Sequence, residues 1–109
     1  MKRIVWLGDS LERIRAFGIE ARHEAGVQLG FVQAGEEPAS WRAMPSVGLG
    51  VSEIRVRAGG AFRVIYMAKF TEAVYVLHAF QKKSSKTARS DIELARLRFR
   101  ALVQARRRQ

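Results

Sequence analysis

"VSEIRVRAGGAFRVIYMAKFTEAVYVLHAFQ", residues 51–81, contains three runs rich in β-branched and aromatic residues. They extend from Val51 to Arg57, from Ala61 to Phe70 and from Ala73 to Gln81. AGGA separates the first two runs, and the dipeptide TE separates the last two. Connections this short join neighbouring antiparallel strands, so the sequence predicts an antiparallel meander at the centre of the fold.

Upstream of the meander, the sequence predicts a short strand followed by two helices. RIVWL, from Arg3 to Leu7, is rich in strand formers, and apolar residues recur mostly at helical spacing from Leu11 to about Ala34. Gly18 interrupts this pattern, so we expect two helices hinged near it and packed as a hairpin. The following AGEEPASWRAMPSVGLG holds both prolines and is expected to be an ordered connection.

Downstream of the meander, the sequence predicts one more helix. Thr87 or Ser90 is expected to cap it, and Ser90 and Glu93 have capping-box spacing. The expected order is β-α-α-β-β-β-α. This order predicts an α+β fold in which the helical hairpin packs on one face of an antiparallel sheet, with residues 1–109 forming a single domain.

The composition favours a polyanionic partner. The chain has 20 Lys and Arg against 10 Asp and Glu, a formal net charge of +10, which attracts polyanions at long range. The absence of cysteine excludes disulfides, thiolate nucleophiles and the usual zinc clusters, and we expect no metal or cofactor. No signal peptide or membrane-spanning run is recognisable, so a soluble cytoplasmic protein is expected.

Strand alternation predicts a basic face on the sheet. Counting back from a two-residue TE turn places Ile65 opposite His78 and Arg63 opposite Phe80. Because side chains alternate between faces, Arg63, His78, Phe80 and Lys82 then share one face. We expect this face to remain open, since the helical hairpin covers the other one.

The first hairpin leaves two registers open. A three-residue loop with a glycine bulge adds Arg55 and Arg57 to the same face. A two-residue Gly-Gly loop turns both side chains away from it.

An open basic face with interleaved aromatic rings suits a phosphate and a stacked base. The face has no carboxylate pair, no Ser/His/Asp set and no metal-ligand cluster. RNA needs none of these, because its 2′-hydroxyl can attack the adjacent phosphate. Arg63 would stabilise the developing phosphorane, and a histidine or lysine with a suitable pKa would move the protons.

Structural interpretations compete with these assignments. His78 lies in an apolar run and is typical of a core histidine. Lys82, Lys83 and Lys86 are also typical of charges that guard a strand end against aggregation. Tyr66 is more often a core residue than a catalytic one.

Several motifs carry a family resemblance. They are an E-[IL]-R strand, a glycine turn, an aromatic-R-V-[IL]-Y strand, and LHAFQKK followed by KT and an IELAR helix. Together with the preceding GEEPASWRAMPSVG, they make this chain resemble the phage-related, HigB-like branch of the RelE/ParE superfamily of toxin–antitoxin toxins. Ala88 departs from the family pattern, which usually has proline after KT.

The resemblance implies a metal-independent, ribosome-dependent mRNA endonuclease held silent by an antitoxin of helix-turn-helix type. The implied partners are therefore the antitoxin, the ribosome and mRNA. The alternatives are a ParE-type gyrase poison and a non-catalytic protein that binds nucleic acid or antitoxin. Motif position and strand alternation together give two groups of candidate residues: catalytic Arg63, His78, Lys83 and Tyr66, and phosphate-binding Arg55, Arg57, Lys82 and Lys86.

Overall fold

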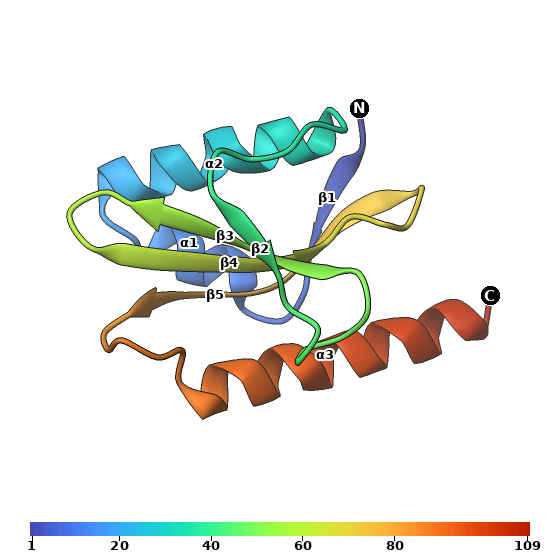
Figure 1. Ribbon diagram of the computed structural model, residues 1–109. Coiled ribbons are helices and arrows are strands. Elements are labelled where there is room, and N and C mark those ends of the chain that lie inside the picture. The colour runs from blue at the N-terminus through green and yellow to red at the C-terminus, as the bar shows by residue number, and fades with distance from the viewer.

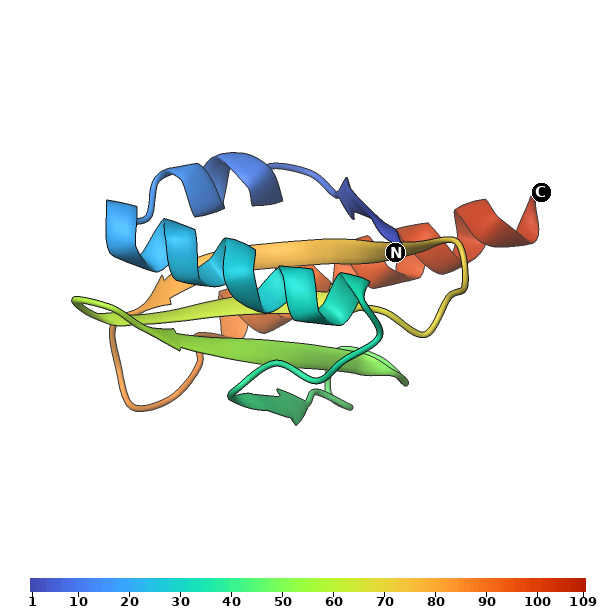
Figure 2. The same cartoon turned by 90° about the horizontal axis from the view of Figure 1, so that it is seen from above.

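The computed structural model describes residues 1–109 as one five-stranded sheet with helices on both faces (Figures 1 and 2). The strands lie in the order β1-β5-β4-β3-β2. The expected α+β class is confirmed. The elements are β1 (Arg3–Trp6), α1 (Ser10–Arg15), α2 (Ile19–Gln33), β2 (Trp41–Ala43), β3 (Val51–Arg57), β4 (Ala61–Met67), β5 (Ala73–Lys82) and α3 (Arg89–Arg107).

Two features of the sheet differ from the prediction. The segment read as a connection contributes the short edge strand β2, which pairs antiparallel with β3. At the other edge, β1 pairs parallel with β5, so the sheet is mixed and not purely antiparallel. The β1–β5 pairing joins segments that are distant in the sequence, and an irregular loop separates β2 from β3. Neither pairing therefore has a short turn that would indicate it in the sequence.

The β3–β4 hairpin adopts the register with the three-residue loop. Arg57 pairs with Ala61, leaving Ala58 to Gly60 as the loop. Gly59 has a φ of +71°, a conformation that favours glycine. Arg55 therefore lies directly opposite Arg63 on the same face of the sheet.

The β4–β5 pairing is as predicted at the site, although the predicted turn is wrong. Arg63 pairs with Phe80 and Ile65 pairs with His78. The connection is longer than TE, because β4 ends at Met67 and β5 begins at Ala73. A register shift after Ile65 leaves Leu77 without a partner on β4. Because of this bulge, the residues on its far side from the loop pair as a two-residue turn would have paired them.

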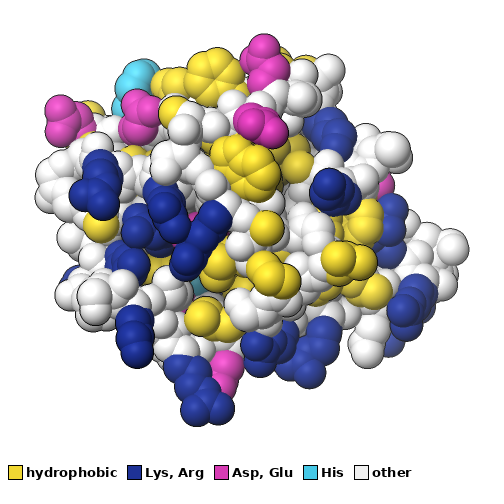
Figure 3. Space-filling view, viewed as in Figure 1, with side chains coloured by type: hydrophobic (Ala, Val, Ile, Leu, Met, Phe, Trp, Pro, Cys, Tyr) yellow, Lys and Arg dark blue, Asp and Glu magenta, His cyan; other side chains and the backbone are white.

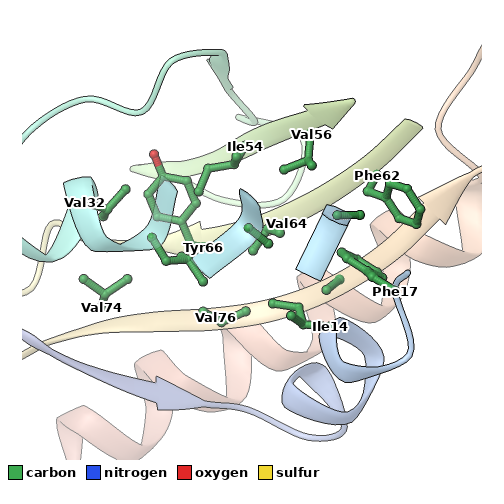
Figure 4. Packing of buried hydrophobic residues seen from close by; sticks show 14 residues of the cluster. Ile14, Phe17, Val32, Ile54, Val56, Phe62, Val64, Tyr66, Val74 and Val76 are labelled. Carbon is green, nitrogen blue, oxygen red and sulfur yellow. The ribbon is translucent and has the colours of Figure 1, made fainter. Parts of the chain in front are cut away.

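The α1–α2 hairpin covers one face of the sheet, as predicted. Ile14 and Phe17 from the α1 side and Leu29 from α2 pack against the buried side chains of β3, β4 and β5 (Figure 4). Arg63 and His78 share the opposite face, which confirms the predicted placement of these two residues.

That opposite face is not open along its whole length, which corrects the prediction. Ala95 and Leu102 of α3 pack on it against Ile65, Leu77 and Phe80, while α2 covers the other face (Figure 1). The apolar stripe of α3 and the apolar half of this face bury each other. The part of this face that remains exposed is formed by β2 and by Arg55 and Arg57 of β3, whereas Arg63 of β4 is buried. α3 begins at Arg89 with Ala88 as its N-cap and no side-chain cap hydrogen bond, so the expected cap at Thr87 or Ser90 does not form.

Arg98 fixes α3 to the rest of the molecule. Its Nη1 donates to the backbone carbonyl of Leu77 at 2.9 Å, and its Nη2 donates to Asp9 Oδ1 at 2.7 Å. Asp9 also accepts from Arg13 Nε at 2.9 Å. The hydrogen bonds from Arg13 and Arg98 lower the pKa of Asp9 to about 2.

Candidate nucleic-acid interface

Four arginines form a cluster on this face of the sheet, and all of them except Arg63 are exposed. Arg42 comes from β2, Arg55 and Arg57 from β3, and Arg63 from β4. Register places them together, since Arg55 lies opposite Arg63 and Arg42 lies opposite Glu53. Figure 3 shows Lys and Arg side chains gathered over this part of the molecule. We call these four residues the arginine cluster.

Glu53 lies at the centre of the arginine cluster. Its Oε1 is 3.0 Å from Arg42 Nε, 3.5 Å from Arg63 Nε and 3.8 Å from Arg55 Nε. The Glu53 side chain is completely buried, whereas the side chains of Arg42 and Arg55 are 45% and 40% exposed. Glu53 therefore accepts a hydrogen bond from Arg42 and lies within ion-pair distance of Arg55 and Arg63.

Arg63 lies deeper than its neighbours. Its side chain is 7% exposed, and its Nη1 donates to the backbone carbonyl of Phe62 at 3.0 Å. Burial lowers the pKa of Arg63, and Glu53 opposes this effect. The guanidinium stays protonated at neutral pH, since the ordinary pKa of arginine is very high. Arg63 thus supplies a fixed positive charge with a small exposed edge.

His78 is completely buried between β5 and α3. Its Nε2 lies 2.8 Å from Asp91 Oδ1, and its ring stacks on Phe80 with 5.2 Å between centroids. Burial lowers the pKa of His78, while the hydrogen bond and charge of Asp91 oppose that shift. The arrangement fits the core-histidine interpretation, because the ring has no surface through which to touch a ligand.

Tyr66 lies on the wrong face for the proposed chemistry. Its ring is buried with Val32 of α2 and with Val64 and Val74 of the sheet (Figure 4). Burial raises the pKa of its hydroxyl. The register shift after Ile65 does not alter this placement, because Tyr66 follows Ile65 on β4 and points to the opposite side. The sheet thus separates Tyr66 from the arginine cluster.

The lysines are distributed over the end of β5 and the segment that follows it. Lys82 is partly exposed at the last position of β5, and Lys83 and Lys86 are exposed beyond it. Lys83 also lines a hollow of about 350 Å³, together with Arg13 of α1 and Asp91 of α3. The lysines form a basic rim around the end of β5. Lys82 pairs there with Ala61 of β4, whereas the hollow beside Lys83 is lined from α1 and α3.

The sequence profile of the phage-derived Gp49-like family (DUF891) matches residues 12–100. This span includes all eight candidate site residues. The chain belongs to the phage-derived Gp49-like family. It is a RelE-like family of toxins from toxin–antitoxin systems, which implies an antitoxin as partner of this Gp49-like chain. Among curated proteins, no sequence matches the chain.

In this Gp49-like protein, sequence reasoning missed Glu53 and Arg42. Alternation along β3 carried a signal for Glu53, because it shares a face with Arg55 and Arg57. Arg42 had no such signal, since β2 was not recognised as a strand. No group of three or more His, Cys, Asp or Glu side chains is arranged to hold a metal ion.

The Gp49-like chain has no helix that combines the length and apolar character needed to cross a bilayer.

Proposed function

We propose that this Gp49-like protein is a HigB-like, ribosome-dependent mRNA endonuclease that acts in the cytoplasm as the toxin of a toxin–antitoxin pair. The observation that carries the proposal is the arginine cluster, in which three exposed guanidinium groups lie beside the largely buried one of Arg63. Its chemistry matches a phosphodiester backbone, because guanidinium groups donate paired hydrogen bonds to phosphate oxygens. Family membership supports the toxin assignment.

The reaction requires no group beyond RNA and cationic side chains. The 2′-oxygen attacks the adjacent phosphorus, the bond to the 5′-oxygen breaks, and the products are a 2′,3′-cyclic phosphate and a 5′-hydroxyl. The 2′-hydroxyl gives its proton to solvent water, and the departing 5′-oxygen receives one proton. The arginines stabilise charge on the phosphorane, and we assign the proton delivered to the 5′-oxygen to Lys83 of the rim.

Within this proposal, the candidate residues take different roles. Arg63 and Arg55 contact the reacting phosphate, while Arg57, Lys82 and Lys86 hold neighbouring phosphates. His78 has a positioning role, because it joins β5 to α3 below the lysine rim and does not reach the surface. Tyr66 has no role in the reaction.

The test is mRNA cleavage in a cell-free translation reaction, mapped by primer extension. Arg63→Ala should lower cleavage by roughly a hundredfold or more, as loss of one oriented charge donor commonly does, and lower ribosome binding far less. Arg63→Lys keeps the charge without the planar fork and should also be impaired. Arg100→Ala is the matched control, because Arg100 is exposed on α3.

Two outcomes would overturn the proposal. Wild-type protein that binds ribosomes in a co-sedimentation assay without cutting mRNA would indicate a non-catalytic binder. DNA damage in expressing cells without mRNA cleavage would indicate a gyrase poison. Co-expression with the product of a neighbouring helix-turn-helix reading frame should abolish toxicity if that product is the antitoxin.

A further inference from the structure

The carboxylate beneath the arginine cluster is unusual in its environment. Glu53 is completely buried, and its Oε2 has no hydrogen-bond partner. Burying a charged carboxylate is unfavourable unless cations and hydrogen bonds compensate for the lost water. Here the compensation is concentrated on Oε1, which accepts a hydrogen bond from Arg42 Nε and lies within 4 Å of the Nε atoms of Arg55 and Arg63.

Glu53 makes the close grouping of the arginines possible. Arg55 and Arg63 lie directly opposite each other on adjacent strands, an arrangement of like charges that destabilises a sheet. Arg42 approaches the same point from β2. One negative charge within 4 Å of all three guanidinium groups offsets their mutual repulsion.

The contacts also leave the outer edges of the guanidinium groups available. Arg42 and Arg55 face Glu53 through Nε, and none of their Nη atoms donates a hydrogen bond within the protein. Both side chains are 40% exposed or more. A guanidinium that is held through Nε presents its Nη atoms in a fixed direction, which suits a phosphate arriving from solvent.

We propose that Glu53 is a positioning residue for RNA phosphate, an inference that rests on the proposed function. It orients the guanidinium groups of Arg42, Arg55 and Arg63. Its negative charge also weakens the attraction between these groups and RNA phosphate. Glu53 thus makes binding weaker than the arginines alone would give, but makes the bound phosphate better aligned. Removing its charge separates the two effects.

The test compares Glu53→Gln with Glu93→Gln. Both variants remove one negative charge, but Glu93 is exposed on α3 and pairs with Arg89. Binding of a single-stranded oligoribonucleotide is followed by fluorescence anisotropy, and cleavage is followed in the translation reaction. Glu53→Gln should bind the oligonucleotide about threefold more tightly than Glu93→Gln does, since the local positive charge is greater. Its cleavage should fall by about tenfold or more, since the fixed orientation is lost.

Glu53→Asp keeps the negative charge but shortens the side chain by one methylene, which moves the carboxylate away from the arginines. It should bind the oligonucleotide like wild type and cleave less, so it provides the test if Glu53→Gln fails to fold. A Glu53→Gln protein that matches Glu93→Gln in both binding and cleavage would overturn the inference.

An NMR measurement separates this inference from the proposed function. In wild type, the Nε–H signal of Arg42, which donates to Glu53, should exchange slowly with solvent and shift when the oligonucleotide is added. In Glu53→Gln it should exchange faster. If wild type cuts no mRNA but shows this signal, the proposed function fails and the positioning role stands. Equal exchange in both proteins would overturn the positioning role alone.

Discussion

The Nε2 atom of His78 lies 2.8 Å from Oδ1 of Asp91, and this contact joins the middle of β5 to the first turn of α3. The histidine is completely buried, and its Nδ1 has no hydrogen-bond partner. An ionised carboxylate only accepts, so Nε2–H is the donor to Asp91, and burial lowers the pKa of His78, which favours the neutral ring. Arg98 of α3 and Arg13 of α1 also disfavour its protonation, while Asp91 favours it.

The first prediction concerns stability in mild acid. The pKa of His78 is lowered from 6.5 in the folded protein, mainly by burial, so the unfolded chain binds the proton more readily. Stability should therefore fall as pH drops through about 6.5, which is the ordinary histidine value. Urea unfolding at a series of pH values from about 8 to 5 measures the effect. His78→Gln should reduce this pH dependence, whereas His23→Gln, at an exposed position on α2, should not. Equal dependence in all three proteins would contradict the assignment.

The second prediction concerns Tyr66. Tyr66→Phe should leave mRNA cleavage and oligoribonucleotide binding unchanged, because the ring lies beneath α2 on the face opposite the arginine cluster. The measurement is the cleavage assay, with Arg63→Ala as the variant that does lose activity. Loss of cleavage in a folded Tyr66→Phe protein would show that the hydroxyl reaches the reaction, contrary to this placement.

Local patterns predicted the strands and their pairing near the site, because a hairpin register depends on a short turn and on side-chain alternation. Ile65 opposite His78 and Arg63 opposite Phe80 are confirmed. The longer β4–β5 loop and the bulge at Leu77 were not predicted, because they depend on packing and carry no signal as strong as that of AGGA.

Long-range packing was the part that the sequence did not reveal. Whether the basic face would be open or covered depended on where α3 packs. The apolar stripe of α3 predicts that the helix packs on an apolar surface but does not identify that surface. Covering by α3 changed His78 from an expected catalytic residue to a buried one. Glu53 was missed because its importance depends on three arginines from different strands meeting at one point.

The third prediction concerns the attachment of α3. Arg98→Met removes the donors to the Leu77 carbonyl and to Asp9. Because Leu77 is buried, its carbonyl loses a partner without gaining water, and the free energy of unfolding should fall by about 1–3 kcal/mol. Urea unfolding provides the measurement. Arg100→Met, on the exposed side of the same helix, should change stability far less. Similar losses in the two variants would indicate a general helix effect.

The fourth prediction concerns two glycines. Gly59→Ala places a side chain at a φ of +71° in the β3–β4 loop and should cost about 1 kcal/mol. Gly26→Ala lies within α2, where an added Cβ meets nothing within 4 Å, and should stabilise the protein by about 0.5–1 kcal/mol. Thermal unfolding of both variants checks the opposite signs. A stabilising Gly59→Ala would mean that this loop does not require glycine.

The parallel pairing of β1 with β5 has a consequence for the order of folding. Arg3 pairs with Ala73, so the first strand can join the sheet only after the last strand has formed. The β3–β4 and β4–β5 hairpins are local and can assemble early, whereas β1 must close a loop of roughly 70 residues, which costs entropy before any contact compensates for it. During synthesis, β1 leaves the ribosome before β5 and is therefore among the last elements to be fixed in place. Before that, the α1–α2 hairpin that follows β1 has no completed sheet to cover.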